Sequence, residues 1–433
     1  LNGNRSNWAM DFAQSQDRSA TLNDPAKLQF GIYPDVYFNA NAGALSTTLG
    51  ADTTIRSLNF TKGAGGPVTI GAGNTLTIGT VDNSVTLSSP YTLMNCGGIT
   101  VQAGSGAHTL AADVILGANQ TWANVSTNDF NVSGSVSGSY ILTVSRGFTF
   151  FEPGVYTPNP TNTMYASYTT IATNYTGSGA IVLSGNNSYT GGTYVNNGTL
   201  VVSGQSEPNS GTGTGPVTIN AGGILSGNGR IAGSVAVANA SNTLLYPNIK
   251  GGGVLTLGGN LSFSGAYSGA SFNLGADSNT GNDKVVLENK TLTCGGAQII
   301  IRNTSPNGLS TSDYVLFDTG LSGTISGSFN SQPVWSGTPP SNSPQYAVLT
   351  EGHTVVMHYY PIGAGQIDIT NNSAVTIKFL GVPTNGYIVE TTTNLTAPWH
   401  PVSTNQAGAD GSWLFVDTNT TANSQRFYRL IAP

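Results

Sequence analysis

The chain carries few charged residues. Lys, Arg, Asp and Glu make up 8% of its 433 residues, whereas about 25% is typical of globular proteins. Arg146 is the only basic residue between Gly63 and Gly229, so no basic stripe could follow a phosphate backbone, and we predict no nucleic-acid partner. Disordered chains combine a high net charge with few β-branched and aromatic residues. This chain has a net charge of −6 and abundant Val, Ile, Thr and Tyr, which indicates an ordered, β-rich protein.

Cysteine is also scarce. Cys96 and Cys294 are the only two, and each precedes a Gly-Gly pair. In a fold of stacked coils, two residues so far apart in the sequence lie many coils from each other. This separation favours two small buried hydrophobic residues over a disulfide bond, although the sequence leaves both open. Two cysteines without neighbouring histidines do not form a zinc site.

Long apolar runs are missing as well. No run approaches the roughly 20 apolar residues of a transmembrane helix, so we predict no membrane span. The chain begins with Leu1 rather than Met. We therefore expect an exported protein, outside the cell or on a bacterial cell surface, whose signal peptide has been removed.

What the chain has in abundance is short apolar runs between turn residues. From Gly177 to Gly265, runs of four to seven residues alternate with Gly, Asn and Ser, and 57 glycines occur in the whole chain. Such runs predict strands, and no segment of this stretch has the spacing of an amphipathic helix. The runs expected to form strands are Ala180–Leu183, Thr199–Val202, Val217–Asn220, Ile231–Val237 and Val254–Leu257.

The regular spacing of these runs predicts an all-β fold, a right-handed parallel β-solenoid over residues 41–360, in which each coil buries its apolar positions against the next. Coils of about 20 residues stacked about 4.8 Å apart would give a rod of about 75 Å. Residues 366–433 lack the repeats and predict a separate small β-sandwich.

Two further segments differ from the coils. Residues 1–40 mix charged and aromatic residues, which favours a cap over the end of the solenoid, with a segment that pairs with a neighbouring subunit as the alternative. Near residues 131–176 the coil pattern loosens, which predicts an aromatic insertion that packs back on the coil or binds sugar rings or a partner. The aromatic residues of this insertion are Phe148, Phe150, Phe151, Tyr156, Tyr165 and Tyr168.

The segment Gly185–Gly204 reads GNNSYTGGTYVNNGTLVVSG. It resembles the autotransporter-associated β-strand repeat, also called the passenger-associated transport repeat. The matching positions are Asn187, Tyr189, Thr190, Gly191, Gly192, Thr193, Asn197, Gly198, Thr199 and Leu200. With its continuation from Gly215 and a similar pattern from Asn282, the motif covers about a quarter of the chain. The resemblance implies an exported bacterial solenoid and no particular chemistry.

The C-terminal part resembles a small β module of secreted proteins from Verrucomicrobia-type bacteria. That module brings no activity to carry over, and surface attachment or sorting is only a suggestion. The positions that match it are Tyr387, Leu395, Trp399, Phe415, Asp417, Arg426, Phe427, Tyr428 and Arg429.

Catalytic groups are hard to find in the coils. Solenoid enzymes that cleave polysaccharides need paired carboxylates, one as acid and one as nucleophile or base. From Asn131 to Ala276 the only carboxylates are Glu152 and Glu207, and neither has a basic partner in a repeat pattern. A polysaccharide-degrading enzyme is therefore the least favoured function.

Metal sites are equally weak in the sequence. Asp277, Asp283 and Glu288 have the spacing of a calcium loop, but Gly281 and Asn282 stand at ligand and glycine positions of that loop. We therefore interpret the segment as a polar turn. The four histidines are His108, His353, His358 and His400. His353 and His358 are five residues apart, so on one strand they face opposite sides. We predict no catalytic residue, no cofactor and no metal site.

Composition, pattern and resemblance together predict a non-catalytic extracellular structural protein. We expect it to associate with itself, head to tail, as the subunit of a surface fibre, filament or sheath, because a solenoid has two open edges. The alternative is a cell-surface adhesin that binds glycans through the aromatic stretch Phe148–Tyr168 or the C-terminal sandwich.

Overall fold

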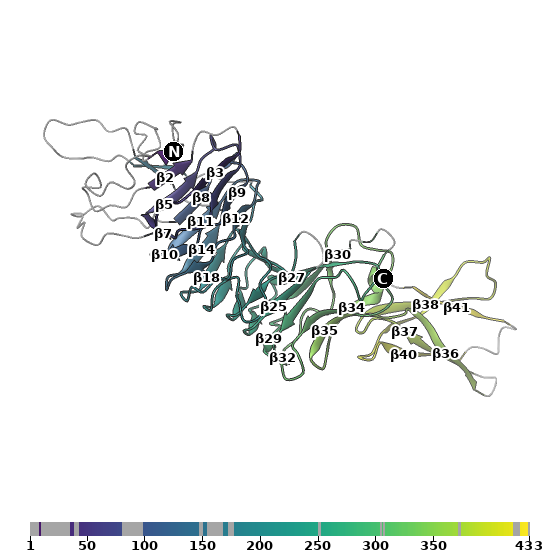
Figure 1. Ribbon diagram of the computed structural model, residues 1–433. Coiled ribbons are helices and arrows are strands. Elements are labelled where there is room, and N and C mark those ends of the chain that lie inside the picture. The colour runs from purple at the N-terminus through teal and green to yellow at the C-terminus, as the bar shows by residue number, and fades with distance from the viewer. Residues whose placement is uncertain are drawn as a thin grey trace.

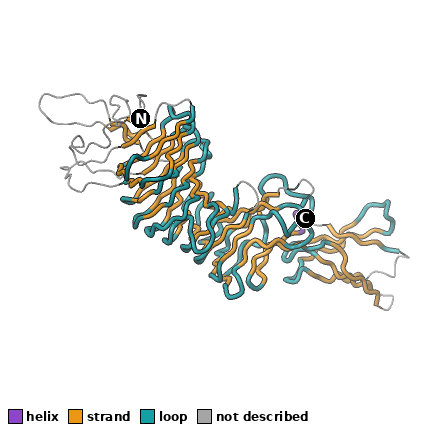
Figure 2. The backbone as a smooth tube through the Cα atoms, viewed as in Figure 1, coloured by secondary structure: helices purple, strands orange, loops and turns teal. Residues whose placement is uncertain are grey.

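The computed structural model describes residues 8–9, 35–38, 43–79, 98–146, 150–153, 168–171, 177–249, 253–303, 305, 308–370, 374–418 and 425–431. These residues form 41 strands and one 3-10 turn, η1 (Ser343–Gln345), and no α-helix occurs among them. Figures 1 and 2 show an elongated stack of short strands that leads into separate C-terminal sheets. The predicted all-β fold with a parallel β-solenoid is confirmed.

Each coil of the solenoid has up to three faces. Face 1 is a twelve-stranded sheet and face 2 an eleven-stranded sheet. Face 1 contains β1 (Trp8–Ala9), β2 (Asp35–Phe38), β5 (Ser57–Phe60), β8 (Gly98–Val101), β11 (Gln120–Asn124), β14 (Leu142–Ser145), β18 (Thr193–Asn196), β20 (Val217–Ile219), β23 (Val235–Val237), β26 (Leu261–Phe263), β29 (Thr291–Thr293) and β32 (Thr324–Ser326). Face 2 contains β3 (Leu45–Thr48), β6 (Val68–Gly71), β9 (His108–Leu110), β12 (Phe130–Val132), β17 (Ile181–Leu183), β19 (Thr199–Val202), β21 (Ile224–Gly227), β24 (Thr243–Tyr246), β27 (Ser268–Leu274), β30 (Gln298–Asn303) and β33 (Val334–Trp335).

Face 3 is not one sheet but two. Its first part orders four strands as β13-β10-β7-β4, and its second part orders six strands as β22-β25-β28-β31-β35-β34. The strands of the first part are β4 (Thr53–Ile55), β7 (Leu76–Ile78), β10 (Val114–Leu116) and β13 (Val136–Ser137). Those of the second part are β22 (Arg230–Ile231), β25 (Val254–Leu257), β28 (Lys284–Leu287), β31 (Tyr314–Asp318), β34 (Tyr346–Glu351) and β35 (Thr354–Tyr359). Between β13 and β22, residues 184–191 and 203–216 occupy this side of the stack without a named strand; we call them the face-3 junction.

The coils bury alternate side chains in one continuous core. On face 1, Val144, Val195 and Ile219 stand in register on neighbouring strands and are fully buried. The residue before each of them on its strand is less buried and faces outward. Because side chains alternate across a strand, every three- or four-residue strand gives the core about two apolar groups.

The rod is shorter than the sequence predicted. Coil length varies: Leu142 stands 22 residues after its partner Gln120, but Thr193 stands 51 residues after Leu142. Of the twelve strands of face 1 all but β1 are parallel, and eleven rungs about 4.8 Å apart span about 50 Å. Segments that leave the coil use residues without adding rungs.

The two ends of the solenoid differ. At the start, β1 pairs antiparallel with β2 of the same chain, so Trp8–Ala9 lies on the outer edge of face 1. At the far end, β34 and β35 form an antiparallel hairpin that continues face 3 beyond β31. Most of the predicted N-terminal segment, residues 1–40, lies outside the described residues.

The aromatic segment begins later than residue 131. Residues 131–146 belong to the coils, where they complete β12 and form β13 and β14. Between β14 and β17, β15 (Phe150–Pro153) pairs antiparallel with β16 (Tyr168–Ile171). Of the aromatic residues named above, Phe148, Tyr156 and Tyr165 lie outside the described residues.

The C-terminal part is a small β-sandwich. One three-stranded antiparallel sheet contains β36 (Gly363–Thr370), β37 (Ala374–Leu380) and β40 (Ser412–Asp417), and the other contains β38 (Gly386–Thr392), β39 (His400–Gln406) and β41 (Phe427–Ile431). They share a core of their own, formed by Ile377, Phe379, Tyr387, Val389, Ala407, Trp413 and Phe415. In Figure 1 these sheets lie at the opposite end of the molecule from the first coils.

Candidate functional site

The repeat motif lies at the face-3 junction, and its side chains hold coils together. The Asn187 side chain is 5% exposed. Its Oδ1 accepts a hydrogen bond from the Val136 N–H at 2.7 Å, and its Nδ2 donates to the Gly211 carbonyl at 2.7 Å. The Gly211 N–H in turn donates to the Arg230 carbonyl at 2.8 Å. Asn187 therefore connects β13, the last strand of the first part of face 3, to the coil that precedes β22.

The neighbouring motif residues also stabilise the packing of the coils. Tyr189 is fully buried, and its hydroxyl lies 2.6 Å from the Thr193 hydroxyl. Burial raises the pKa of Tyr189, so its hydroxyl stays protonated. A Cβ on Gly191 would lie 2.2 Å from the backbone carbon of Tyr140, and Gly192 has φ of +88°. Both positions require glycine, one for space and one for conformation.

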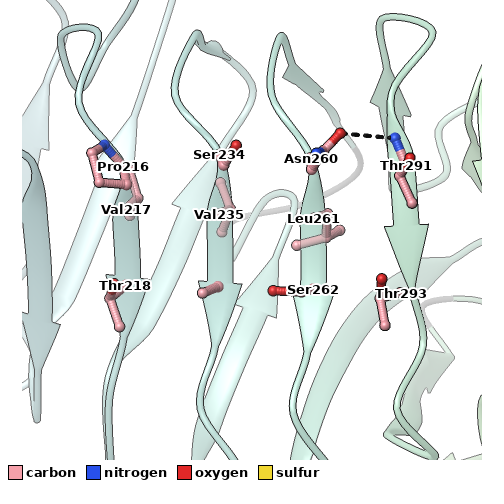
Figure 3. Close-up of a pocket in the computed structure, with 11 residues that line it drawn as sticks. Pro216, Val217, Thr218, Ser234, Val235, Asn260, Leu261, Ser262, Thr291 and Thr293 are labelled. Carbon is pink, nitrogen blue, oxygen red and sulfur yellow. Dashed lines mark hydrogen bonds between the residues drawn. The ribbon is translucent and has the colours of Figure 1, made fainter.

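An open groove crosses the outer side of face 1 over four successive rungs, β20, β23, β26 and β29 (Figure 3). Its volume is about 320 Å³. The lining residues are Pro216, Val217, Thr218, Ser234, Val235, Ala236, Asn260, Leu261, Ser262, Thr291 and Thr293. None of these eleven side chains is ionisable. No pattern in the sequence signals this groove, because its residues belong to coils of unequal length.

The floor of the groove is one row of small side chains in register. Thr218 pairs with Ala236, Ala236 with Ser262, and Ser262 with Thr293. All four are half-buried and alternate with buried residues of the same strands, and Thr218, Ser262 and Thr293 are labelled in Figure 3. The next residue of this row toward the N-terminus is Tyr194, which pairs with Thr218 and is 38% exposed.

The residues that resembled a calcium loop point in different directions. Asp277 accepts hydrogen bonds from the Asn279 N–H at 2.9 Å and the Thr280 hydroxyl at 2.9 Å. Asp283 is fully buried and accepts from the Gly253 and Asn273 N–H groups at 2.8 and 2.7 Å. The Asp277 carboxylate therefore accepts hydrogen bonds within the turn, and the Asp283 carboxylate accepts them from the coil.

Burial dominates the titration of the Asp283 carboxyl. It raises the pKa of Asp283 to about 6, although the N–H donors from Asn273 and Gly253 act in the opposite direction. Glu288, the third carboxylate of the spacing, forms an ion pair with Arg230 at 2.6 Å on face 3. The Arg230 guanidinium lowers the pKa of Glu288 below its usual range.

His108 and Cys294 are buried in the core of the coils. His108 is fully buried and stacks on Phe60 at 4.3 Å between ring centroids. Its Nδ1 accepts from the Val68 N–H at 3.0 Å, which makes Nε2 the protonated nitrogen facing the Ser105 hydroxyl at 2.6 Å. Burial lowers the pKa of His108 to about 4. Cys294 is a free, buried thiol whose pKa burial raises to about 12, and Cys96 lies outside the described residues.

One group of possible metal ligands was missed by sequence reasoning. The ligand atoms of Asp313, Glu351 and His358 lie within 4.8 Å of one another. His358 Nδ1 is 2.9 Å from Asp313 Oδ2 and 3.7 Å from Glu351 Oε1, and the side chains are 31–47% exposed. Asp313 precedes β31, 45 residues before His358, so no local spacing signals the group. As it stands, the group is a surface cluster in which His358 contacts Asp313. His353 does not join it and instead contacts the Gly323 carbonyl.

Most residues that match the C-terminal module make contacts within the β-sandwich. The Tyr387 ring stacks on Trp413 at 4.9 Å, and its hydroxyl accepts from the Val382 N–H at 2.7 Å. The Tyr428 hydroxyl donates to Asp417 at 2.7 Å, and Arg429 lies over the Trp399 ring.

Residues 175–202 match the sequence model of the family Passenger-associated-transport-repeat. The repeat thus coincides with the segment in which Asn187 and Tyr189 hold neighbouring coils together, which confirms the resemblance of Gly185–Gly204. A search of curated proteins finds no match to the chain. The match to the passenger-associated transport repeat indicates a secreted or cell-surface protein of the kind associated with autotransporters.

The part of the chain that the structure describes holds no helix with the length and hydropathy that a membrane crossing requires.

Proposed function

We propose that this protein is a non-catalytic structural protein of the bacterial exterior, and that its copies join end to end in a fibre, filament or sheath. The observation that carries the proposal is that the first and last rungs end in edge strands. Among the described residues, β3 and β4 are the outermost strands of faces 2 and 3 at the start, and β32 and β33 those of faces 1 and 2 at the far end. Edge strands offer rows of N–H and C=O groups to which another chain can add.

The two ends are different surfaces, so a contact between them is head to tail. Repeated head-to-tail contacts that do not close into a ring produce a filament. The low charge supports the same proposal. With 8% charged residues and a net charge of −6, neighbouring copies repel each other little.

The non-catalytic part of the proposal is supported by where the carboxylates lie. Glu288 is paired with Arg230, and Asp283 is buried among N–H donors. The groove on face 1 has no carboxylate in its lining. A hydrolase of polysaccharides needs two carboxyl groups facing its substrate.

Electron microscopy of the purified protein over a range of concentrations tests the assembly. We expect filaments with a repeat near the length of one rod plus its C-terminal sandwich. Monodisperse single particles at every concentration, with a constant mass in analytical ultracentrifugation, would refute end-to-end assembly.

A substitution at the β3 edge makes the test specific. The Leu45 N–H donates to the Pro67 carbonyl on the side of β6. Because N–H groups alternate sides along a strand, that of Ser46 points to the outer edge. Ser46→Pro removes this donor without touching the bonds to β6 and should shorten or abolish filaments. Ser46→Ala, the matched control, should assemble like the unaltered protein.

A further inference from the structure

The groove on face 1 has the chemistry of a binding site for an uncharged polymer. Its lining presents hydroxyl groups from Thr218, Ser234, Ser262 and Thr293 on neighbouring rungs, and no ionisable group. An anionic polymer would find no cation there to replace its counterions. A ligand that gains from this surface must carry many neutral hydroxyl groups at short intervals.

One polar side chain of the groove is already oriented. Asn260 Oδ1 accepts a hydrogen bond from the Thr291 N–H at 3.0 Å (Figure 3). One acceptor site of this carboxamide oxygen is thus used by the protein, and the NH₂ group can donate to a ligand. The fixed orientation reduces the entropy that binding would cost.

Tyr194 adds an aromatic surface at one end. It stands on β18, directly beside Thr218 in the register of face 1, and is 38% exposed. Beyond Tyr194 the row continues with Thr218, Ala236 and Ser262, none of which rises as far from the sheet as a tyrosine ring. A flexible peptide would gain little here, because the groove crosses the middle of a sheet and offers no strand edge to pair with.

We propose that this groove binds a neutral linear oligosaccharide or polysaccharide, which lies along the axis of the solenoid with one sugar ring on Tyr194. The sugar hydroxyls exchange hydrogen bonds with the hydroxyl and amide groups of successive rungs. The faces of the sugar rings contact Pro216, Ala236 and the Tyr194 ring. This binding is independent of end-to-end assembly, since the groove lies on the side of the rod.

Calorimetric titration of the full chain with cellohexaose, xylohexaose and mannohexaose tests the proposal, with an oligogalacturonate of similar length as the charged comparator. We expect saturable binding of at least one neutral hexasaccharide and none of the anionic one. Thr218→Arg places a long charged side chain in the groove and should weaken that binding at least tenfold. Thr121→Arg is the matched control, because Thr121 is a half-buried, outward residue on β11 of the same face but outside the groove. Its affinity should stay within about twofold of the unaltered protein.

Tyr194→Ala should weaken binding about fivefold or more through loss of the stacking surface. Circular dichroism and gel filtration of each variant check that the coils are intact. Absence of saturable binding by all three neutral hexasaccharides would overturn the proposal. So would equal affinity of the Thr218→Arg and Thr121→Arg variants. Filament formation by Thr218→Arg, measured in parallel, should be unchanged, so a failure of glycan binding is separable from a failure of assembly.

Discussion

Asn187→Ala is the substitution that most directly tests how the repeat motif works. At the face-3 junction, where separate main-chain hydrogen bonds join the coils, Asn187 adds two side-chain hydrogen bonds, both 2.7 Å long, to the Val136 N–H and the Gly211 carbonyl. Alanine leaves both backbone groups without this partner in a place where the side chain was 5% exposed. Each buried group left unsatisfied costs about 1–3 kcal/mol. A water molecule that enters the space recovers part of this, so we expect a loss of about 3 kcal/mol.

Hydrogen exchange followed by mass spectrometry is the suitable assay, because a long solenoid opens locally and does not unfold in two states. A loss of about 3 kcal/mol corresponds to roughly a hundredfold faster exchange for the Val136 amide and for peptides that cover residues 203–216. Peptides from β26 and β29, several rungs away, should exchange as in the unaltered protein.

Two further variants sharpen this experiment. Asn186→Ala removes an identical, exposed side chain one position away and should change the stability by less than about 0.5 kcal/mol. Asn187→Asp keeps an oxygen for the Val136 N–H but loses the donor to the Gly211 carbonyl, so exchange should rise mainly at residues 203–216. If Asn187→Ala and Asn186→Ala exchange alike, Asn187 does not hold the junction and the reasoning is wrong.

Three other predictions follow from the described contacts. As the pH falls from about 6.5 to about 4, the coil around His108 should lose about 3 kcal/mol of stability. The imidazole of the unfolded chain takes up a proton in this range, whereas the buried imidazole, with its pKa of about 4, does not. Hydrogen exchange of the β6 peptide, corrected for intrinsic rates, should therefore become faster. Gly191→Ala should destabilise the coil by about 1–3 kcal/mol, since its Cβ would meet the backbone at 2.2 Å, while Gly50→Ala, with open space around it, should be neutral. Arg230→Ala should reduce the local stability by about 2 kcal/mol, because it removes the partner of Glu288. The double variant with Glu288→Gln should lose less stability than the sum of the two single variants, as measured by hydrogen exchange of β22 and β25.

Each of these has its own control or contrary outcome. Asp283 titrates with the opposite sign, since its raised pKa stabilises the fold at low pH and this contribution is lost as the pH rises from about 4 to about 6. Exchange near β6 separates the two effects, and a flat profile there would mean that His108 does not control the coil. A Gly191→Ala variant as stable as Gly50→Ala, or additive costs for Arg230 and Glu288, would contradict the other two predictions.

Short apolar runs between turn residues sufficed to predict individual strands. Thr199–Val202 and Val254–Leu257 are strands with the predicted bounds. Ile231–Val237 was predicted as one strand but contains the end of β22, a corner at Gly233 and β23. A Cβ on Gly233 would lie 1.9 Å from the Gly215 carbonyl oxygen, so the chain passes this corner in contact with the preceding coil. A contact across coils of this kind leaves no mark in the local pattern.

The same limit applies to the sites. Resemblance identified Asn187 as a motif residue, but its partners are 51 and 24 residues away, so its role required the register of the coils. The groove was not predicted at all. The spacing of Thr218, Ala236 and Ser262 changes from 18 to 26 residues along the row, and unequal coil lengths conceal any repeat of small residues.

The division of face 3 also governs how the rod responds to a pull along its axis. Over most of its length, three ladders of main-chain hydrogen bonds would have to break together. Between β13 and β22 only two ladders are continuous. Separate main-chain bonds, such as that from the Ser188 N–H to the Val136 carbonyl, and the side-chain bonds of Asn187 take the place of the third. Under mechanical load the molecule should therefore part first at this level, releasing two shorter stacks that each retain three-sided coils.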